Sequence, residues 1–310
     1  SLINSMPSAV AQGLIWGIMA IGVYLTYRIL DVADLTVDGS LGTGGAVCVV
    51  MVLNGAPVGL ALLAATAAGM LAGLVTGLFH TACGIPAILA GILTQLALYS
   101  VNLRIMGFGT GGGKANLPIS VDKYSLLVSA RYVRNVALNN PILILVIFCA
   151  VLIAVLYWFF GTELGCSLRA TGANQNMARA QGINTNVAKV LGLMISNGLV
   201  ALAGGLLAQY QGFSDINMGR GAIVIGLAAV IIGEVIFSRI FRNFALKLLS
   251  AVIGAIIYYI VMVFVLRLGL STDDLKLLTA LVVALFLTIP YWKGKYFTKT
   301  SVKKGEKNHA

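Results

Sequence analysis

The chain has 310 residues, of which 59% are hydrophobic and only 10% are charged, and its mean hydropathy is +0.96. Soluble domains carry about 25% charged residues, so this composition excludes an ordinary soluble protein and favours an integral membrane protein. The formal net charge of +11 would suit nucleic-acid binding. The cations, however, lie in connecting segments and at the C-terminal end, as expected for the cytoplasmic face of a membrane protein, and we expect no nucleic-acid partner.

Long runs without charge predict the membrane spans. The stretch from Gly39 to Leu103 contains no Asp, Glu, Lys or Arg over 65 residues, and about 20 apolar residues suffice for one helical crossing. The sequence therefore predicts an all-α polytopic membrane protein with about nine transmembrane helices, within a range of about eight to ten. The expected spans are 10–29, 37–54, 56–79, 85–105, 140–160, 188–210, 221–238, 245–267 and 275–291.

The distribution of Lys and Arg predicts the orientation. We expect one transmembrane domain over 1–292 and a basic cytoplasmic tail over 293–310. Counting back through nine spans places the N-terminus outside, with 13 Lys and Arg inside and 8 outside. The segment 106–139 then lies outside, where its Gly, Asn, Pro and Ser content predicts an exposed cap. The opening SLINSM has no charged n-region, so we expect no signal peptide.

The sequence offers no enzyme motif. The run Gly107–Lys114 is superficially similar to a phosphate-binding loop, but Phe108 replaces the first required Gly and Ala115 the final Ser or Thr. An intramembrane hydrolase would need a nucleophile with a base in reach, and the only histidines are His80 and His309. The four cysteines show no paired metal spacing. We therefore expect neither catalytic residues nor a metal or other cofactor bound by this chain.

One acidic cluster, Asp31, Asp34 and Asp38, stands where the first two spans meet. These carboxylates could bind a metal, or they could cap the second helix, whose N-terminal end favours negative charge. In a third interpretation Asp38 lies inside a broken helix, because DGSLGTGGA has four glycines in nine residues and glycine disfavours regular helix. Half-helix ends at membrane depth are where transporters bind polar solutes, so we predict a discontinuous second helix.

Polar side chains within the spans are candidates for a solute path. Gln95, Tyr99 and Asn102 recur at helical spacing on one face of the fourth span, and Asn197 lies in the sixth. Such side chains face the bundle interior or a wet cavity, and helix–helix hydrogen bonding explains them as well as a path does. The predicted path residues are Asp38, Gln95, Tyr99, Asn102 and Asn197.

Two further patterns predict helix contacts. Glu234 is a lone carboxylate in an apolar segment, which is costly in lipid, so we expect a structural ion pair with Arg239 or Arg242 near the cytoplasmic end. Glycines at every fourth position of the third span predict one flat face for close helix packing. These glycines are Gly69, Gly73 and Gly77.

The segment 161–187 predicts a short cytoplasmic helix. Asn174 suits an N-cap, residues 175–181 suit a helix, and Gly182 followed by Ile183 suits a glycine C-cap. So short a helix is marginal alone and must be held by adjoining spans or by a partner. It would present Met177, Ala178 and Gln181 along one side, flanked by Arg169 and Arg179. Either it docks into a groove on a cytosolic protein, or it lies on the bilayer surface.

The stretch LGCSLRATGANQNMARAQGIN resembles the cytoplasmic coupling loop of permease subunits of bacterial ATP-binding-cassette importers, in the branched-chain amino acid and ribose permease superfamily. Segments 34–40, 85–107, 201–213 and 218–234 are similar to a subfamily that works with periplasmic or lipoprotein binding proteins, some linked to tryptophan or tyrosine. The likeness covers about 10–290. One departure is Ala115, where we expect the subfamily to prefer proline. The residues that match the coupling loop are Arg169, Ala170, Asn174, Ala178, Gly182 and Ile183.

The resemblance implies a permease subunit that moves a small polar solute across the bacterial plasma membrane by alternating access, and the expected cargo is an amino acid, aromatic amino acids included. It implies two cytosolic ATPase subunits that hold ATP and Mg, a second permease copy in a homodimer, and an extracytoplasmic binding protein. The alternatives are an ion-gradient-coupled secondary carrier, which needs a carboxylate at the midplane from Glu234 or Asp38, and a structural scaffold. The expected ATPase-coupling residues are Arg169, Ala170, Asn174, Met177, Ala178, Gln181, Gly182 and Ile183.

Overall fold

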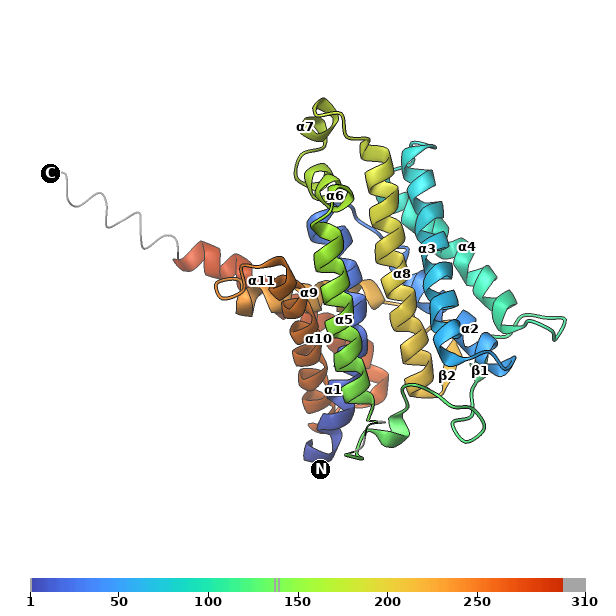
Figure 1. Ribbon diagram of the computed structural model, residues 1–310. Coiled ribbons are helices and arrows are strands. Elements are labelled where there is room, and N and C mark those ends of the chain that lie inside the picture. Colours follow the sequence, from blue (N-terminus) through green and yellow to red (C-terminus); the bar gives the residue numbers. More distant parts are fainter. Residues whose placement is uncertain (1, 137, 139, 298–310) are drawn as a thin grey trace.

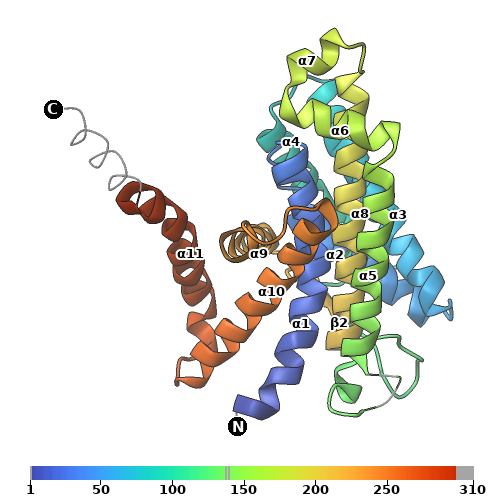
Figure 2. The ribbon, with the colours of Figure 1, turned by 60° about the vertical axis from the view of Figure 1, so that its left-hand side comes forward.

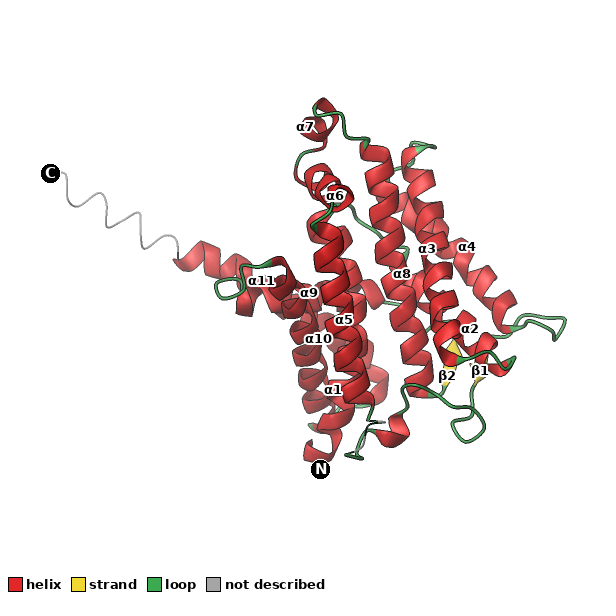
Figure 3. Ribbon diagram, viewed as in Figure 1, coloured by secondary structure: helices red, strands yellow, loops and turns green. Residues whose placement is uncertain are grey.

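The computed structural model describes residues 2–297 except 137 and 139. Apart from two short strands and the loops, the described chain is helical (Figure 3). The helices are α1 (Leu2–Tyr24), α2 (Val37–Leu53), α3 (Val58–Thr81), α4 (Ala87–Met106), α5 (Pro141–Phe160), α6 (Glu163–Ala173), α7 (Gln175–Ala180), α8 (Thr185–Gln211), α9 (Ala222–Phe237), α10 (Phe244–Arg267) and α11 (Leu275–Phe297). A π turn, Leu25–Ile29, extends α1, and the strands are β1 (Asn116–Pro118) and β2 (Phe213–Asp215).

The expected all-α polytopic architecture is confirmed. Within the described residues, seven helical segments are long and apolar enough to cross a membrane, and α2 and α9 are shorter apolar helices at the positions of the second and seventh expected spans. The count of nine crossings therefore stays a prediction. The helix α11 continues to Phe297, and the rest of the expected basic tail, 298–310, lies outside the described residues.

The bundle is built around α1 and α8. Almost every side chain of α1 from Gly13 onward and of α8 from Ser196 onward is buried. The helix α3 packs along α8, α10 packs along α1, and α2 crosses α8 on the same side as α3. The N-terminus lies at one end of the bundle and α6 and α7 at the other (Figure 1). These are called the N-terminal end and the α7 end below.

Glycines bring α3 and α8 into close contact, as predicted. A Cβ on Gly73 would overlap the carbonyl oxygen of Leu193, and one on Gly69 would overlap that of Asn197. A Cβ on Gly77 would lie 3.0 Å from the Cα of Val190. Because lipid provides no hydrophobic drive between helices, small residues that allow backbones to approach supply the packing energy.

The second span is one continuous helix, so the break that the sequence predicts inside it does not occur. Residues 30–36 are non-helical and lead from the α7 end into the bundle, and α2 begins only at Val37 (Figure 1). The glycines of DGSLGTGGA lie inside regular helix, which corrects the expected break there. Gly44 shows the reason, because its Cα faces Ala201 of α8 so closely that a Cβ would overlap the Ala201 carbonyl. Tight packing outweighs the poor helix propensity of glycine.

The segment 106–139 is more than the exposed cap expected from its composition. Its strand β1 pairs with β2 in an antiparallel register that places Leu117 opposite Ser214. The chain then passes from β2 into α9, so this small sheet lies directly before α9, which like α2 is a short apolar helix. Three-residue strands carry too little periodicity to be predicted from sequence.

The last helix is attached on one side only. Val282 and Val283 of α11 pack against Ala228 and Ile232 of α9 and Tyr258 of α10. Figure 2 shows α11 diverging from α1 toward the α7 end. Most of its side chains are exposed.

Candidate functional site

Two consecutive short helices project at the α7 end. The sequence predicts only the second; α6 was missed, although Thr162 caps it by accepting a hydrogen bond from the Gly165 N–H at 3.4 Å. A Cβ on Gly172 would overlap the carbonyl oxygen of Ile29, so α6 lies directly against the π turn that ends α1. The α6–α7 segment is thus seated on the first span.

The predicted caps of α7 are confirmed. The Asn174 side chain accepts a hydrogen bond from the Met177 N–H at 3.1 Å. At the other end Gly182 has φ +84°. The Gly182 N–H donates to Arg179 O and the Ile183 N–H donates to Ala178 O, each at 3.0 Å. This pair of bonds is the Schellman motif, which satisfies carbonyls that a helix end leaves open.

The face that α7 presents differs in part from the prediction. Met177 is 47% exposed and Gln181 is exposed, as expected, but Ala178 is fully buried. Ala178 therefore anchors α7 to its own chain and is not available on the surface. The Arg179 Nε donates to Thr185 Oγ1 at 3.0 Å, which ties α7 to the start of α8.

Arg169 lies on α6 and stacks on aromatic rings. Its guanidinium lies 4.4 Å from the ring centroid of Phe244, the first residue of α10, and 5.6 Å from that of Phe160 at the end of α5. Cation–π contacts of this kind hold a side chain in place. Ala170, its neighbour, is half-buried. The predicted coupling residues thus divide between α6, which contacts the spans, and α7, which projects.

A buried hydrogen-bond network links the start of α2 to α8. The Asp34 carboxylate accepts from the Thr36 N–H at 3.0 Å and from the Asn197 amide at 2.9 Å. The Ser40 hydroxyl donates to the Asn197 carbonyl oxygen at 2.6 Å. Asp34 therefore fixes the turn before α2, whose N-cap residue Thr36 has no side-chain cap, while Asn197 serves helix–helix hydrogen bonding.

Three further bonds link α2 and its first turn to α3 and α4. The hydroxyl of Thr76 on α3 lies 2.6 Å from that of Thr36 and 2.8 Å from that of Thr94 on α4. The Thr43 hydroxyl of α2 donates to the Asn102 side-chain oxygen at 2.7 Å. Among the described residues, every buried side-chain nitrogen or oxygen has a partner.

Asp38 caps a helix other than its own. Its carboxylate accepts from the Ile223 N–H at 3.0 Å and from the Gly221 N–H at 3.4 Å, at the N-terminus of α9. A Cβ on Gly219 would overlap the Asp38 carbonyl oxygen, so the two helix starts are in direct contact. Asp31, by contrast, is exposed at the end of the π turn. The three carboxylates diverge, and among the described residues no cluster suited to a metal ion occurs.

Four of the five predicted solute-path residues, Asp38, Gln95, Asn102 and Asn197, lie around the start of α2. Asp38, Asn102 and Asn197 each hold partners inside the chain. Gln95 is half-buried, with its Cα facing Gly39 of α2, whereas Tyr99 is 45% exposed. Of the predicted stripe, Gln95 and Asn102 face α2, and Tyr99 lies on the exposed surface of α4. The path role of these residues stays a prediction.

Glu234 forms the expected ion pair, but with a different partner. Its carboxylate lies 2.5 Å from the Arg28 guanidinium at the end of α1, and neither Arg239 nor Arg242 pairs with it. The prediction chose arginines close to Glu234 along the chain, whereas the fold brings the end of α1 beside the end of α9.

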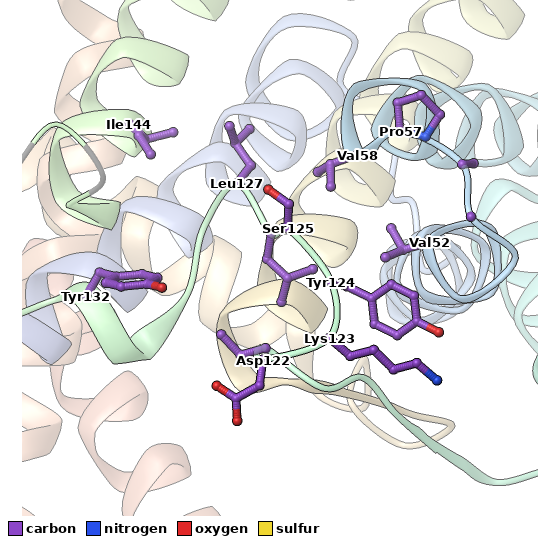
Figure 4. A pocket seen from close by; sticks show the side chains of 14 residues that line it. Val52, Pro57, Val58, Asp122, Lys123, Tyr124, Ser125, Leu127, Tyr132 and Ile144 are labelled. Atoms are coloured by element: carbon purple, nitrogen blue, oxygen red, sulfur yellow. The ribbon is translucent and has the colours of Figure 1, made fainter.

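The N-terminal end of the bundle carries a hollow of about 880 Å³. Its lining comes from the turn after α2 and from residues 122–127, and Figure 4 shows Tyr132 and Ile144 on one side of this loop and Val52 and Pro57 on the other. Both polar and aromatic side chains are available there for contact. Sequence reasoning missed this hollow because its two walls are far apart along the chain.

Comparison with known proteins gives a consistent picture. The family described as "Branched-chain amino acid transport system / permease component" matches residues 5–289. The tyrosine transport system permease protein of Clostridioides difficile (strain R20291) is 41% identical over 92% of this chain and 90% of its own length. An uncharacterised protein of Rickettsia prowazekii (strain Madrid E) is 35% identical over 92% of this chain and 97% of its own length.

One solved structure shares the fold. It is described as PsaBC from Streptococcus pneumoniae in complex with Fab, and it matches with a TM-score of 0.51 over 96% of this chain and 94% of its own. The sequence identity is 15%. The likeness therefore concerns the arrangement of helices.

Proposed function

This chain belongs to the branched-chain amino acid transport system permease family, and we propose that it is the transmembrane subunit of an ATP-binding-cassette importer whose cargo is an amino acid, with an aromatic amino acid as the first candidate. In this proposal the α7 end faces the cytoplasm and the N-terminal end faces outward. Cytosolic ATPase subunits dock on α6 and α7, and two copies of the chain enclose the path.

The observation that carries the proposal is the construction of α7. The helix has only six residues, yet Asn174 closes one end and the Gly182–Ile183 motif closes the other. The buried Ala178 fixes it to the chain, while Met177 and Gln181 remain exposed. A rigid projecting helix with an apolar side chain suits docking into a groove on a partner.

The contacts of α6 explain how such docking would move the spans. Gly172 lies against the end of α1, and Arg169 stacks on Phe244 at the start of α10. A displacement of the α6–α7 segment therefore bears directly on two spans. Alternating access would follow as rigid-body motion, with ATP and Mg held by the partner ATPase.

The cargo assignment is supported by similarity to the tyrosine transport permease, which extends over 92% of this chain. The hollow at the N-terminal end, with Lys123, Tyr124 and Tyr132 in its lining, offers a surface for a binding protein that delivers the solute. In the part of the chain that the structure describes, the buried side-chain polar groups are satisfied internally, which suits selection of the cargo by that binding protein.

A reconstitution of the permease with its ATPase and binding protein tests the proposal. Met177→Glu places a charge on the docking face, and we expect ATPase co-purification and ATP-driven uptake of radiolabelled tyrosine both to fall at least tenfold. Leu270→Glu is the matched control, because Leu270 is similarly exposed at the opposite end of the bundle. Full uptake by the Met177→Glu variant would show that α7 does not couple the ATPase to transport.

The rival function, a carrier driven by an ion gradient, makes the opposite prediction. Such a carrier needs a carboxylate free to bind an ion at membrane depth. Asp34, Asp38 and Glu234 instead hold hydrogen-bond or ion-pair partners within the chain. Uptake by the chain alone under a proton or sodium gradient, without ATPase, would overturn the proposal.

A further inference from the structure

A second site at the α7 end is built from cations. A cavity of about 370 Å³ lies between the end of α1, the helix α6 and the start of α10. Two ring-bearing side chains, Tyr24 and Phe244, form part of its wall. Four basic side chains also line it: Arg28, Arg169, Arg242 and Lys247.

Most of this positive charge has no counter-charge in the described part of the chain. Arg28 pairs with Glu234, but no acidic side chain described in the structure pairs with Arg169, Arg242 or Lys247. No acidic residue lines the cavity. Because like charges around a small volume repel one another, this arrangement favours an anion between them.

A larger groove of about 1030 Å³ also includes Arg28 in its lining, so the two hollows meet at this residue. The groove lies between the ends of α1, α9 and α11, at the side where α11 diverges from the bundle (Figure 2). Its walls include the apolar Ile231, Val235 and Leu287. Arg239 and Lys293 add positive charge, and the one acidic residue in the described lining, Glu234, is paired with Arg28. A basic cavity and a partly apolar groove thus lie side by side on the lateral surface of the bundle.

We propose that these two hollows bind one anionic phospholipid, with its phosphate headgroup in the basic cavity and an acyl chain along the apolar wall of the groove. Basic pockets between transmembrane helices on the cytoplasmic side bind anionic headgroups. A soluble phosphate would fill only the cavity and gain nothing from Ile231, Val235 and Leu287. The headgroup would bridge α1, α6 and α10, the helices that support α7.

Lipid retention by the purified full chain tests this assignment. Native mass spectrometry compares phosphatidylglycerol with phosphatidylcholine of the same chain length. We expect retention of phosphatidylglycerol alone, and a loss of about 30-fold in affinity in Arg242→Gln/Lys247→Gln, since each surface cation contributes about fivefold. Lys189→Gln, a basic residue near the same end on α8 that lines neither hollow, should retain the lipid as the unaltered chain does.

Three outcomes would overturn the site. Equal retention of phosphatidylcholine would mean that charge plays no part. Unchanged phosphatidylglycerol affinity in the double variant, together with lost binding of the ATPase, would assign the cavity to an acidic partner protein. Displacement of the lipid by millimolar inorganic phosphate would show a free-anion site. Arg242→Lys/Lys247→Arg keeps the charge and should bind normally, which separates loss of charge from misfolding.

Discussion

The Asp38 carboxylate, in the first turn of α2, accepts a hydrogen bond at 3.0 Å from the N–H of Ile223, in the first turn of α9. The two residues are 185 positions apart. Both helices are short and each follows a non-helical segment, so this bond joins the starts of two short helices from distant parts of the chain. The negative side chain also meets the positive end of the α9 dipole.

Loss of this cap should destabilise the fold. Asp38→Ala leaves two N–H groups of α9 without their acceptor, and we expect a loss of about 2 kcal/mol in the free energy of unfolding, measured by denaturant titration in detergent. Asp38→Asn keeps one acceptor oxygen and should lose less than half as much. Asp215→Ala is the control, because the Asp215 carboxylate, at the end of β2, accepts from the Asn217 N–H and the Asn116 amide in exposed hydrogen bonds where water can substitute. If Asp38→Asn is fully stable but inactive in uptake, the carboxylate serves the solute path instead.

Asn197 allows a second test of whether these polar residues stabilise the fold or line the solute path. Asn197→Ala removes a donor from the buried Asp34 carboxylate and an acceptor from Ser40. Hydrogen bonds to charged groups contribute about 1.5–3 kcal/mol, so we expect a destabilisation of that size. Asn186→Ala, on an exposed position of the same helix, should change stability by less than about 0.5 kcal/mol. Thermal unfolding followed by tryptophan fluorescence measures both.

The glycine contact between α3 and α8 predicts effects of opposite sign at two positions. Gly73→Ala should destabilise by about 1–3 kcal/mol because the new methyl group overlaps the Leu193 carbonyl. Gly59→Ala, on the same helix with nothing within 4 Å, should be neutral or stabilising by up to about 1 kcal/mol. Equal effects at the two sites would contradict the observed helix contact.

The C-terminal end of α7 depends on one backbone angle. Gly182→Ala forces a Cβ into the left-handed region at φ +84°, at a cost of about 1–2 kcal/mol, and Gly182→Asn should cost less. Hydrogen exchange at the Ile183 amide, which donates to Ala178 O, should accelerate in the same order. Gly112→Ala, in an open loop, should leave this amide unchanged. Slow exchange in the alanine variant would show that α7 closes without the motif.

Local signals predicted the local structure well. Most span boundaries fall within about three residues of the helix ends, and the caps at Asn174 and Gly182 are as expected, because both depend on side chains next to the backbone groups that they satisfy. The start of α1 and the whole of α6 were missed. The helix α6 has only 11 residues and is amphipathic, so hydropathy that identifies membrane spans did not reveal it.

Partners distant in sequence could not be predicted in the same way. The sequence indicated that Glu234 needs a cation and that Asn102 and Asn197 need hydrogen-bond partners. It did not identify Arg28, Thr43 or Asp34, since each pairing depends on how whole helices cross. The regular helix through the glycines of α2 has the same origin, because packing against Ala201 stabilises a backbone that propensity disfavours.

The sequence by itself determined that the chain is a helical membrane protein, which segments form the helices and where α7 begins and ends. These properties follow from hydropathy and capping, whose energies depend on residues within one or two turns. Only the tertiary structure decided that Asp38 closes α9, that Asp34 and Asn197 are partners, and that four cations surround one cavity. In lipid, helix contacts depend on complementary shape and on pairwise hydrogen bonds. Both depend on two helix surfaces at once, so neither segment's sequence specifies them by itself.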